Sequence, residues 1–131
     1  MDIGNIAAAE TGFLHLVHPA TGQKLVTEDG APIGLELSGM YSKAWRNKLN
    51  RLANSKMGGK QKTTAERSFE EMTELLAAVT AVVKNLVVDG VEYTPKNIAE
   101  LYASVKHGWI RKQVDEFIGD DANFFTASDN S

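Results

Sequence analysis

The 131-residue chain contains no cysteine, which excludes disulfide bonds and thiolate metal sites and is typical of proteins from a reducing cytoplasm. Its first residues, MDIGNIAAAETGF, lack the basic start and the long apolar run of a signal peptide. The longest apolar-rich stretch, residues 75–88, is interrupted by Thr80, Lys84 and Asn85 and is too short to span a bilayer. We therefore expect a soluble, intracellular protein that does not associate with a membrane.

The sequence also has few groups that could carry catalysis or hold a metal ion. Its three histidines are His15, His18 and His107, and none belongs to an H-x-x-x-H pair. The spacing of the first two places them on opposite faces of a strand. Residues 57–60, MGGK, lack the complete phosphate-loop pattern, and no nucleophile or dinucleotide-binding motif occurs. We predict a protein without enzymatic activity, metal or other cofactor.

Charge is unevenly distributed, although the net charge is only −3. No acid lies between Glu36 and Glu66, whereas seven of the fourteen basic residues do. These are Lys43, Arg46, Lys48, Arg51, Lys56, Lys60 and Lys62. Acids gather near the C-terminal end, at Asp115, Glu116, Asp120 and Asp121. Two interpretations remain open: the basic zone of one copy contacts the acidic end of the next, or the charges form a solvated face with intramolecular ion pairs.

The N-terminal part of the chain predicts short strands. Residues 1–11 contain Gly4 and a short alanine run, which indicates a mobile N-terminus before a single globular domain over 12–125. Within residues 12–39, apolar residues flank turns at 19–22 and 28–30. This pattern predicts a meander of three short antiparallel strands.

The rest of the chain predicts helices. Ser42 is expected to cap a helix over 42–55, followed by a flexible linker over 56–62. Apolar residues that recur every three or four positions predict one long helix over 63–87. A hairpin-like element over 88–94 should lead to two helices within 95–119, of which the first starts at Thr94 and Pro95 and the second ends at a left-handed Gly119. Residues 126–131 are expected to form a polar tail.

These elements define an α+β fold that is mostly α, in which four helices follow the strands. Apolar residues at helical spacing define the expected core. It comprises Trp45, Leu49, Leu52, Phe69, Met72, Leu76, Val79, Val83, Leu101, Trp109, Val114 and Phe117.

An aromatic pair, Phe124 and Phe125, lies beyond the expected helices in an acidic, otherwise polar segment. Such a pair docks either on a partner or on the surface of its own domain. Together with the charged residues, it completes the candidates for self-association or partner binding. These are Lys43, Arg46, Lys48, Arg51, Asp115, Glu116, Asp120, Asp121, Phe124 and Phe125.

Several short motifs resemble a known protein family. In the last third, V-x-Y-T-P is followed by L-Y, by W-x-x-x-Q and by F-I, which leads into an acidic A-N-F. Near the start, HPATGQKL precedes IGLELSG and Y-x-x-x-W-R. Together these motifs cover about two thirds of the chain. They resemble the tail assembly chaperones of long-tailed, lambdoid (siphovirus-type) bacteriophages.

The resemblance implies a non-enzymatic chaperone of the host cytoplasm that is absent from the mature virion. It would bind and solubilise the tape measure protein, form a spiral homo-oligomer, and help to recruit tail tube protein. Family members commonly contact the tube through an extension made by translational frameshifting, and the codons of 123–125 are a candidate slippery site. No long extension follows Phe125, so this chain would be the short form. Two alternatives remain: a small nucleic-acid-binding module that uses the basic zone, and a structural tail completion protein.

Overall fold

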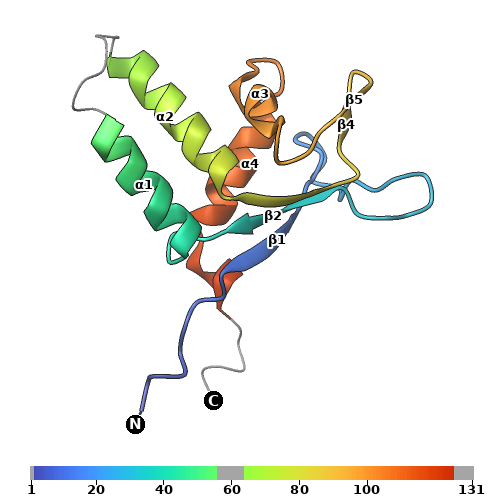
Figure 1. Ribbon diagram of the computed structural model, residues 1–131. Helices are drawn as coiled ribbons and strands as arrows, with labels where there is room; N and C mark the ends of the chain where they lie inside the picture. Colours follow the sequence, from blue (N-terminus) through green and yellow to red (C-terminus); the bar gives the residue numbers. More distant parts are fainter. Residues whose placement is uncertain (1, 56–63, 126–131) are drawn as a thin grey trace.

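The computed structural model describes residues 2–55 and 64–125, so the expected 56–62 linker and 126–131 tail lie outside the described residues (Figure 1). Of the described residues, 42% are helical and 20% form strands, which confirms an α+β fold that is mostly α. The order is β1 Thr11–His15, β2 Gly34–Ser38, α1 Lys43–Ser55, α2 Thr64–Ala78, β3 Thr80–Lys84, β4 Val87–Val88, β5 Val91–Glu92, α3 Ile98–Ala103, α4 Gly108–Ile118 and the 3-10 helix η1 Asp121–Phe124.

Strands β1, β2 and β3 form an antiparallel sheet with β2 in the middle. Leu14, Leu35 and Val83 are opposite one another in the register, so they share the sheet face that packs on the core. The opposite face carries Phe13 and Glu36. The three-strand meander expected within 12–39 is therefore wrong in one respect: residues between β1 and β2 form only isolated bridges, and the third strand comes from β3.

The expected long helix over 63–87 is also wrong, because α2 ends at Ala78 and the chain continues as β3. The sequence of β3, TAVVK, contains three β-branched residues, which favour a strand where a partner strand is available. That partner is β2, which lies more than forty residues earlier in the chain. The helical spacing of the apolar residues did not reveal this non-local pairing.

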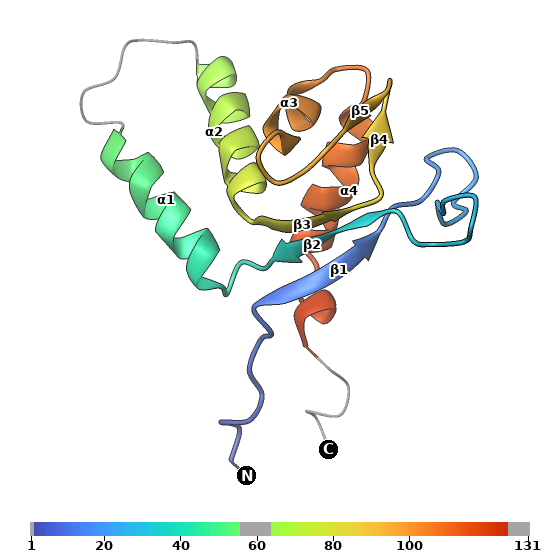
Figure 2. The same ribbon diagram turned by 45° about the vertical axis from the view of Figure 1, so that its right-hand side comes forward.

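Helices α1 and α2 form an antiparallel pair, and α1 lies on the outer side of α2 (Figures 1 and 2). Ser42 caps α1 as predicted: its hydroxyl accepts a hydrogen bond from the Trp45 backbone N–H at 3.2 Å and donates to the Gly39 carbonyl at 2.6 Å. The inner side of α2 packs on α3, which in turn contacts α4. Helix α4 also contacts the central strand β2.

The core lies between the sheet and helices α2, α3 and α4. Its centre is formed by Leu16, Leu35, Leu37, Leu76, Val79, Leu86, Ile98, Leu101, Tyr102, Ile110, Val114 and Ile118. Of the expected core residues, Leu52, Leu76, Val79, Leu101 and Val114 are buried, and Trp45, Val83, Trp109 and Phe117 are partly buried against the core.

Three expected core residues are instead exposed: Leu49 by 43%, Phe69 by 44% and Met72 by 37%. These residues lie on α1 and α2, which are helices as predicted. Part of the apolar face of each helix is left uncovered, and the three side chains lie there. Two expected helix ends also differ. Helix α3 begins after Asn97 rather than at Pro95, and Gly119 has a right-handed φ of −74°.

Candidate partner-binding surfaces

The histidines take part in local hydrogen bonds of the fold. The Nε2 atom of His15 lies 2.7 Å from the Leu25 carbonyl oxygen, and the Nδ1 atom of His18 accepts from backbone N–H groups of its own turn. His107 Nδ1 lies 3.3 Å from the Ser104 hydroxyl. Within residues 2–55 and 64–125, no three His, Cys, Asp or Glu side chains gather in a way that could hold a metal ion.

An apolar groove of 540 Å³ lies between α1 and α2. Its lining residues are Leu49, Asn50, Leu52, Ala53, Ser68, Glu71, Met72 and Leu75. The volume falls within the range of about 300–1,000 Å³ that is common for ligand pockets. The exposure of Leu49 and Met72 is explained by this groove, since nothing among the described residues covers it. The groove is therefore a candidate docking surface for an apolar segment.

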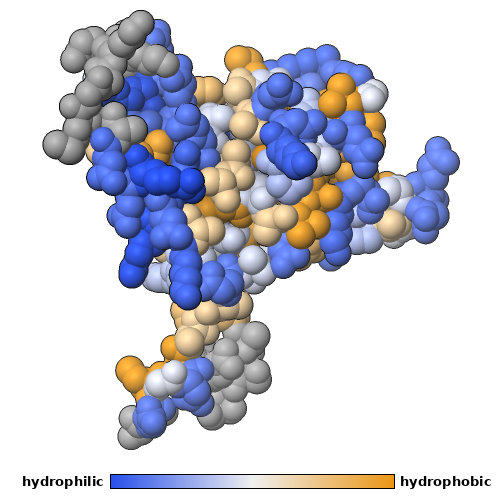
Figure 3. Space-filling view, in the orientation of Figure 1, coloured by the Kyte–Doolittle hydropathy of each residue, from blue (hydrophilic) through white to orange (hydrophobic). Residues whose placement is uncertain are grey.

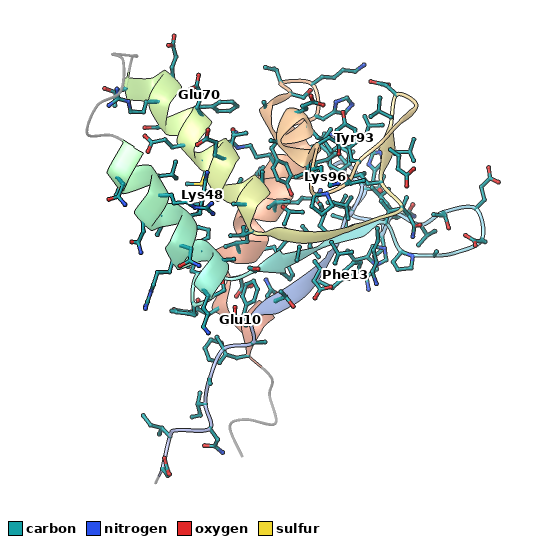
Figure 4. All side chains as sticks on the ribbon, in the orientation of Figure 1. Glu10, Phe13, Lys48, Glu70, Tyr93 and Lys96 are labelled. Carbon is teal, nitrogen blue, oxygen red and sulfur yellow. The ribbon has the colours of Figure 1, made fainter. Side chains whose placement is uncertain are left out.

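Four of the seven predicted basic residues lie on α1, where Lys43, Arg46 and Arg51 are exposed. The other three, Lys56, Lys60 and Lys62, lie outside the described residues. Lys48 is less accessible and lies 3.8 Å from the Glu74 carboxylate of α2 (Figure 4). Of the four cations on α1, Lys48 thus forms an intramolecular ion pair, as the second interpretation of the charges expects. Figure 3 shows hydrophilic atoms along α1 in this view. The other three cations make α1 a basic surface beside the groove.

The predicted acids near the C-terminal end are exposed, and two of them, Glu116 and Asp120, line the same pocket. Glu116 forms an i, i+4 ion pair with Lys112 at 3.9 Å, and Asp120 accepts a hydrogen bond from the Ala122 N–H. Asp115 lies on α4, one residue before Glu116.

Asp121 accepts a hydrogen bond from the Tyr41 hydroxyl at 3.1 Å, and this bond and the carboxylate charge raise the pKa of Tyr41. Tyr41 directly precedes the Ser42 cap of α1. This acid therefore lies beside the start of the basic helix of its own chain.

The aromatic pair is split between two environments. Phe124 is only 3% exposed, and its ring makes an edge contact with Phe117 at a centroid distance of 5.5 Å. Phe125 is half-buried and lies edge-on against Tyr41 at 6.1 Å. Of the two interpretations of the aromatic pair, Phe124 follows docking on its own domain, because η1 folds the chain back between β1 and the start of α1. Phe125 remains accessible.

Residues 2–8 form an arm that projects away from the body at its N-terminal end (Figures 1 and 2). The arm is attached at its base, where the Ala9 N–H donates to the Phe124 carbonyl at 2.7 Å and the Gly39 N–H donates to the Glu10 carbonyl. Ile3 is 65% exposed and Ile6 is 41% exposed. The sequence analysis predicted only mobility for this segment and did not identify it as a binding segment, although its two isoleucines, three positions apart, were an available indication.

A second apolar surface surrounds the β4–β5 hairpin. A pocket of 320 Å³ is lined by Leu25, Ile33, Leu86, Val87, Val88, Asp89, His107, Trp109 and Ile110. Val87 is 60% exposed and Val91, opposite Val88 in the hairpin, is 46% exposed. Figure 3 shows apolar atoms on this hairpin. Sequence reasoning expected the hairpin but did not identify it as a binding surface.

Arg111 of α4 joins three helices, which sequence reasoning also missed. It donates hydrogen bonds to the Thr73 hydroxyl and to the carbonyls of Phe69 and Tyr102, and its guanidinium lies 4.1 Å from the centroid of the Phe69 ring. Partial burial lowers the pKa of Arg111, while the charge of Asp115 opposes this shift. These contacts are structural, since three hydrogen bonds of Arg111 tie α4 to α2 and α3 within the domain.

Comparison with known proteins gives no further assignment: no protein-family model, curated protein or solved structure matches the chain. None of the helices in the described part of the chain is long and apolar enough to cross a membrane.

Proposed function

We propose that this protein is a non-enzymatic tail assembly chaperone of a long-tailed bacteriophage. In this proposal it binds the tape measure protein, keeps the apolar helices of that client in solution, and helps to recruit tail tube subunits through an extended, frameshifted form. The proposal rests on the sequence motifs described above. Its physical support is the uncovered apolar surface of the domain, since a chaperone of this kind must offer apolar contacts without chemistry.

The β4–β5 hairpin is the surface that we assign to the client, and its exposed valines are the observation that carries the assignment. Val87 lines a pocket with Leu86 and Trp109 in its wall, and Val91, which pairs with Val88, exposes its side chain on the opposite face of the hairpin. A client helix could place one or two apolar side chains there. Weak contacts of this size suit a chaperone that binds in many copies along a long client and later leaves it.

Binding to helical segments of the tape measure protein tests this proposal. We expect fluorescence anisotropy to show saturable binding of such segments by the purified chain. The double variant Val87→Asp and Val91→Asp should weaken binding at least tenfold, because it places a charge on each face of the hairpin, one of them in the pocket lining. Val105→Asp is the matched control, since Val105 is 96% exposed and lies outside the pocket lining. Equal binding by all three proteins would reject the assigned surface, and no binding at all would reject the function.

Nucleic-acid binding is the second candidate, and the exposed cations of α1 favour it. Lys43, Arg46 and Arg51 could contact phosphates, and such binding would weaken steeply as salt increases. Retention of the chain on single- or double-stranded DNA or RNA at 150 mM salt, lost in the double variant Arg46→Glu and Arg51→Glu, would favour this candidate over the chaperone.

A further inference from the structure

The α1–α2 groove suits an occupant with apolar side chains and an acidic group that faces the cations of α1. Its floor and walls include Leu49, Leu52 and Met72. Arg46 lies three residues before Leu49 and four before Asn50, so it extends the same side of α1 toward the start of the helix. Helix α1 contains no acid. The groove lining contains one acid, Glu71 on α2, and no basic residue, so an acidic group of the occupant would lie toward Arg46 at the α1 edge rather than toward α2.

The N-terminal arm has this composition. Residues 2–10, DIGNIAAAE, contain Asp2, Glu10 and the two exposed isoleucines, and they contain no basic residue. The arm is narrow, since its remaining side chains are three alanines, an asparagine and a glycine. The arm contains a turn in which the Ile6 N–H donates to the Ile3 carbonyl at 3.0 Å. A short turn with small neighbouring side chains can enter a groove between two helices with Ile3 and Ile6 toward its floor.

The arm leads away from the groove of its own chain. Glu10 marks its base, beside the start of α1, where a Glu10 carboxylate oxygen accepts from the Lys43 N–H at 3.4 Å (Figure 4). From there, residues 2–8 continue away from the body, whereas α1 runs in the other direction (Figures 1 and 2). The arm is therefore directed toward a second copy of the chain rather than toward its own groove.

We infer that residues 2–8 of one copy dock in the α1–α2 groove of the next copy, with Ile3 and Ile6 on the apolar floor and Asp2 toward the cations of α1. The arm and the groove are different surfaces, so each copy can give one arm and receive another. Repetition of this heterologous contact produces an open-ended, head-to-tail assembly. The inference rests on the self-association contained in the proposed function, and it replaces the C-terminal acids with the arm as the partner of the basic helix.

Sedimentation velocity over a range of concentrations tests the contact without any client. We expect the sedimentation coefficient of the wild-type chain to rise with concentration, and to rise less at high salt. The arm variant, Ile3→Asp with Ile6→Asp, and the groove variant, Leu49→Asp with Met72→Asp, should each associate at least tenfold more weakly. All four side chains are exposed, so the variants should unfold at the wild-type temperature. Val105→Asp is again the matched control and should associate like the wild type.

Mixing the two variants gives the decisive result. The groove variant keeps an intact arm and the arm variant keeps an intact groove, so an equimolar mixture should form dimers and nothing larger. A labelled peptide of residues 2–10 should likewise bind the arm variant but not the groove variant. No association in the mixture, an undiminished assembly of either variant, or a wild-type assembly that stops at a dimer would overturn the inference. Because no client is present, these results are independent of whether the chain binds the tape measure protein.

Discussion

Replacement of Phe124 by alanine should destabilise the domain, although the sequence presents this residue as part of an acidic tail. Its side chain is 3% exposed and contacts Phe117 edge-on at 5.5 Å. The ring also lies against Gly39, where an added Cβ atom would come within 2.9 Å of the Phe124 Cδ1 atom. Loss of a ring from such a site costs about 3–5 kcal/mol, because the cavity cannot close completely.

The neighbouring Phe125 is the matched control for this prediction. It is half-buried and contacts Tyr41, which is itself 61% exposed. Phe125→Ala should therefore cost less than Phe124→Ala, because a half-buried ring carries only part of the roughly 1.5–3 kcal/mol gained when a Phe side chain is fully buried.

Equilibrium unfolding in urea, followed by the fluorescence of Trp45 and Trp109, measures both free energies of unfolding. The packing of η1 described above would be refuted if Phe124→Ala cost less than 1 kcal/mol, or if the two variants were equally stable. Partner docking by Phe124 would then be open again.

Three further predictions concern the body of the domain. Gly34→Ala should cost about 1–3 kcal/mol, because its Cβ atom would clash with the Leu14 carbonyl oxygen. Gly108→Ala is the control, since its Cβ atom meets open space, and it should be neutral or stabilise the domain by up to about 1 kcal/mol. The midpoint of thermal unfolding distinguishes the two variants. Burial raises the pKa of Tyr102 to about 12 from an ordinary value of 10.0. The unfolded chain therefore loses this proton first, and on the order of 2 kcal/mol of stability should disappear as pH rises from 10 to 12, but not in Tyr102→Phe. Arg111→Ala should lose about 1.5–3 kcal/mol, against about 0.5 kcal/mol for the exposed Lys112→Ala, in urea unfolding.

The fold class and several local features could be predicted from the sequence because they depend on local signals. The Ser42 cap depends on a hydroxyl directly before an amphipathic helix. The β4–β5 hairpin depends on the Asp89-Gly90 turn, in which both residues have positive φ. Strand β3 could not be predicted in the same way. Its valines fit a helix of period 3.6 as well as a strand, and only pairing with the distant β2 decides between them.

The candidate sites were predicted less well. Whether an apolar side chain is buried or exposed depends on contacts with distant segments, which a local sequence pattern does not contain. Leu49, Phe69 and Met72 have helical spacing, but which side of a helix pair is covered depends on a third element. Phe124 is buried only because η1 returns to the sheet. The arm was not predicted as a binding segment because its composition indicates mobility. Its candidacy depends on the exposure of two isoleucines and on the direction in which it leaves the body, and both require the structure.

The central claim is that this chain keeps a tape measure protein in solution, and co-expression with that protein measures it most directly. The account predicts that the soluble fraction of the tape measure protein rises several-fold with the wild-type chain and with Val105→Asp. It should stay at the level of the empty vector with Val87→Asp and Val91→Asp combined, provided that this variant is expressed and folded. An unchanged soluble fraction with the wild-type chain would contradict the account.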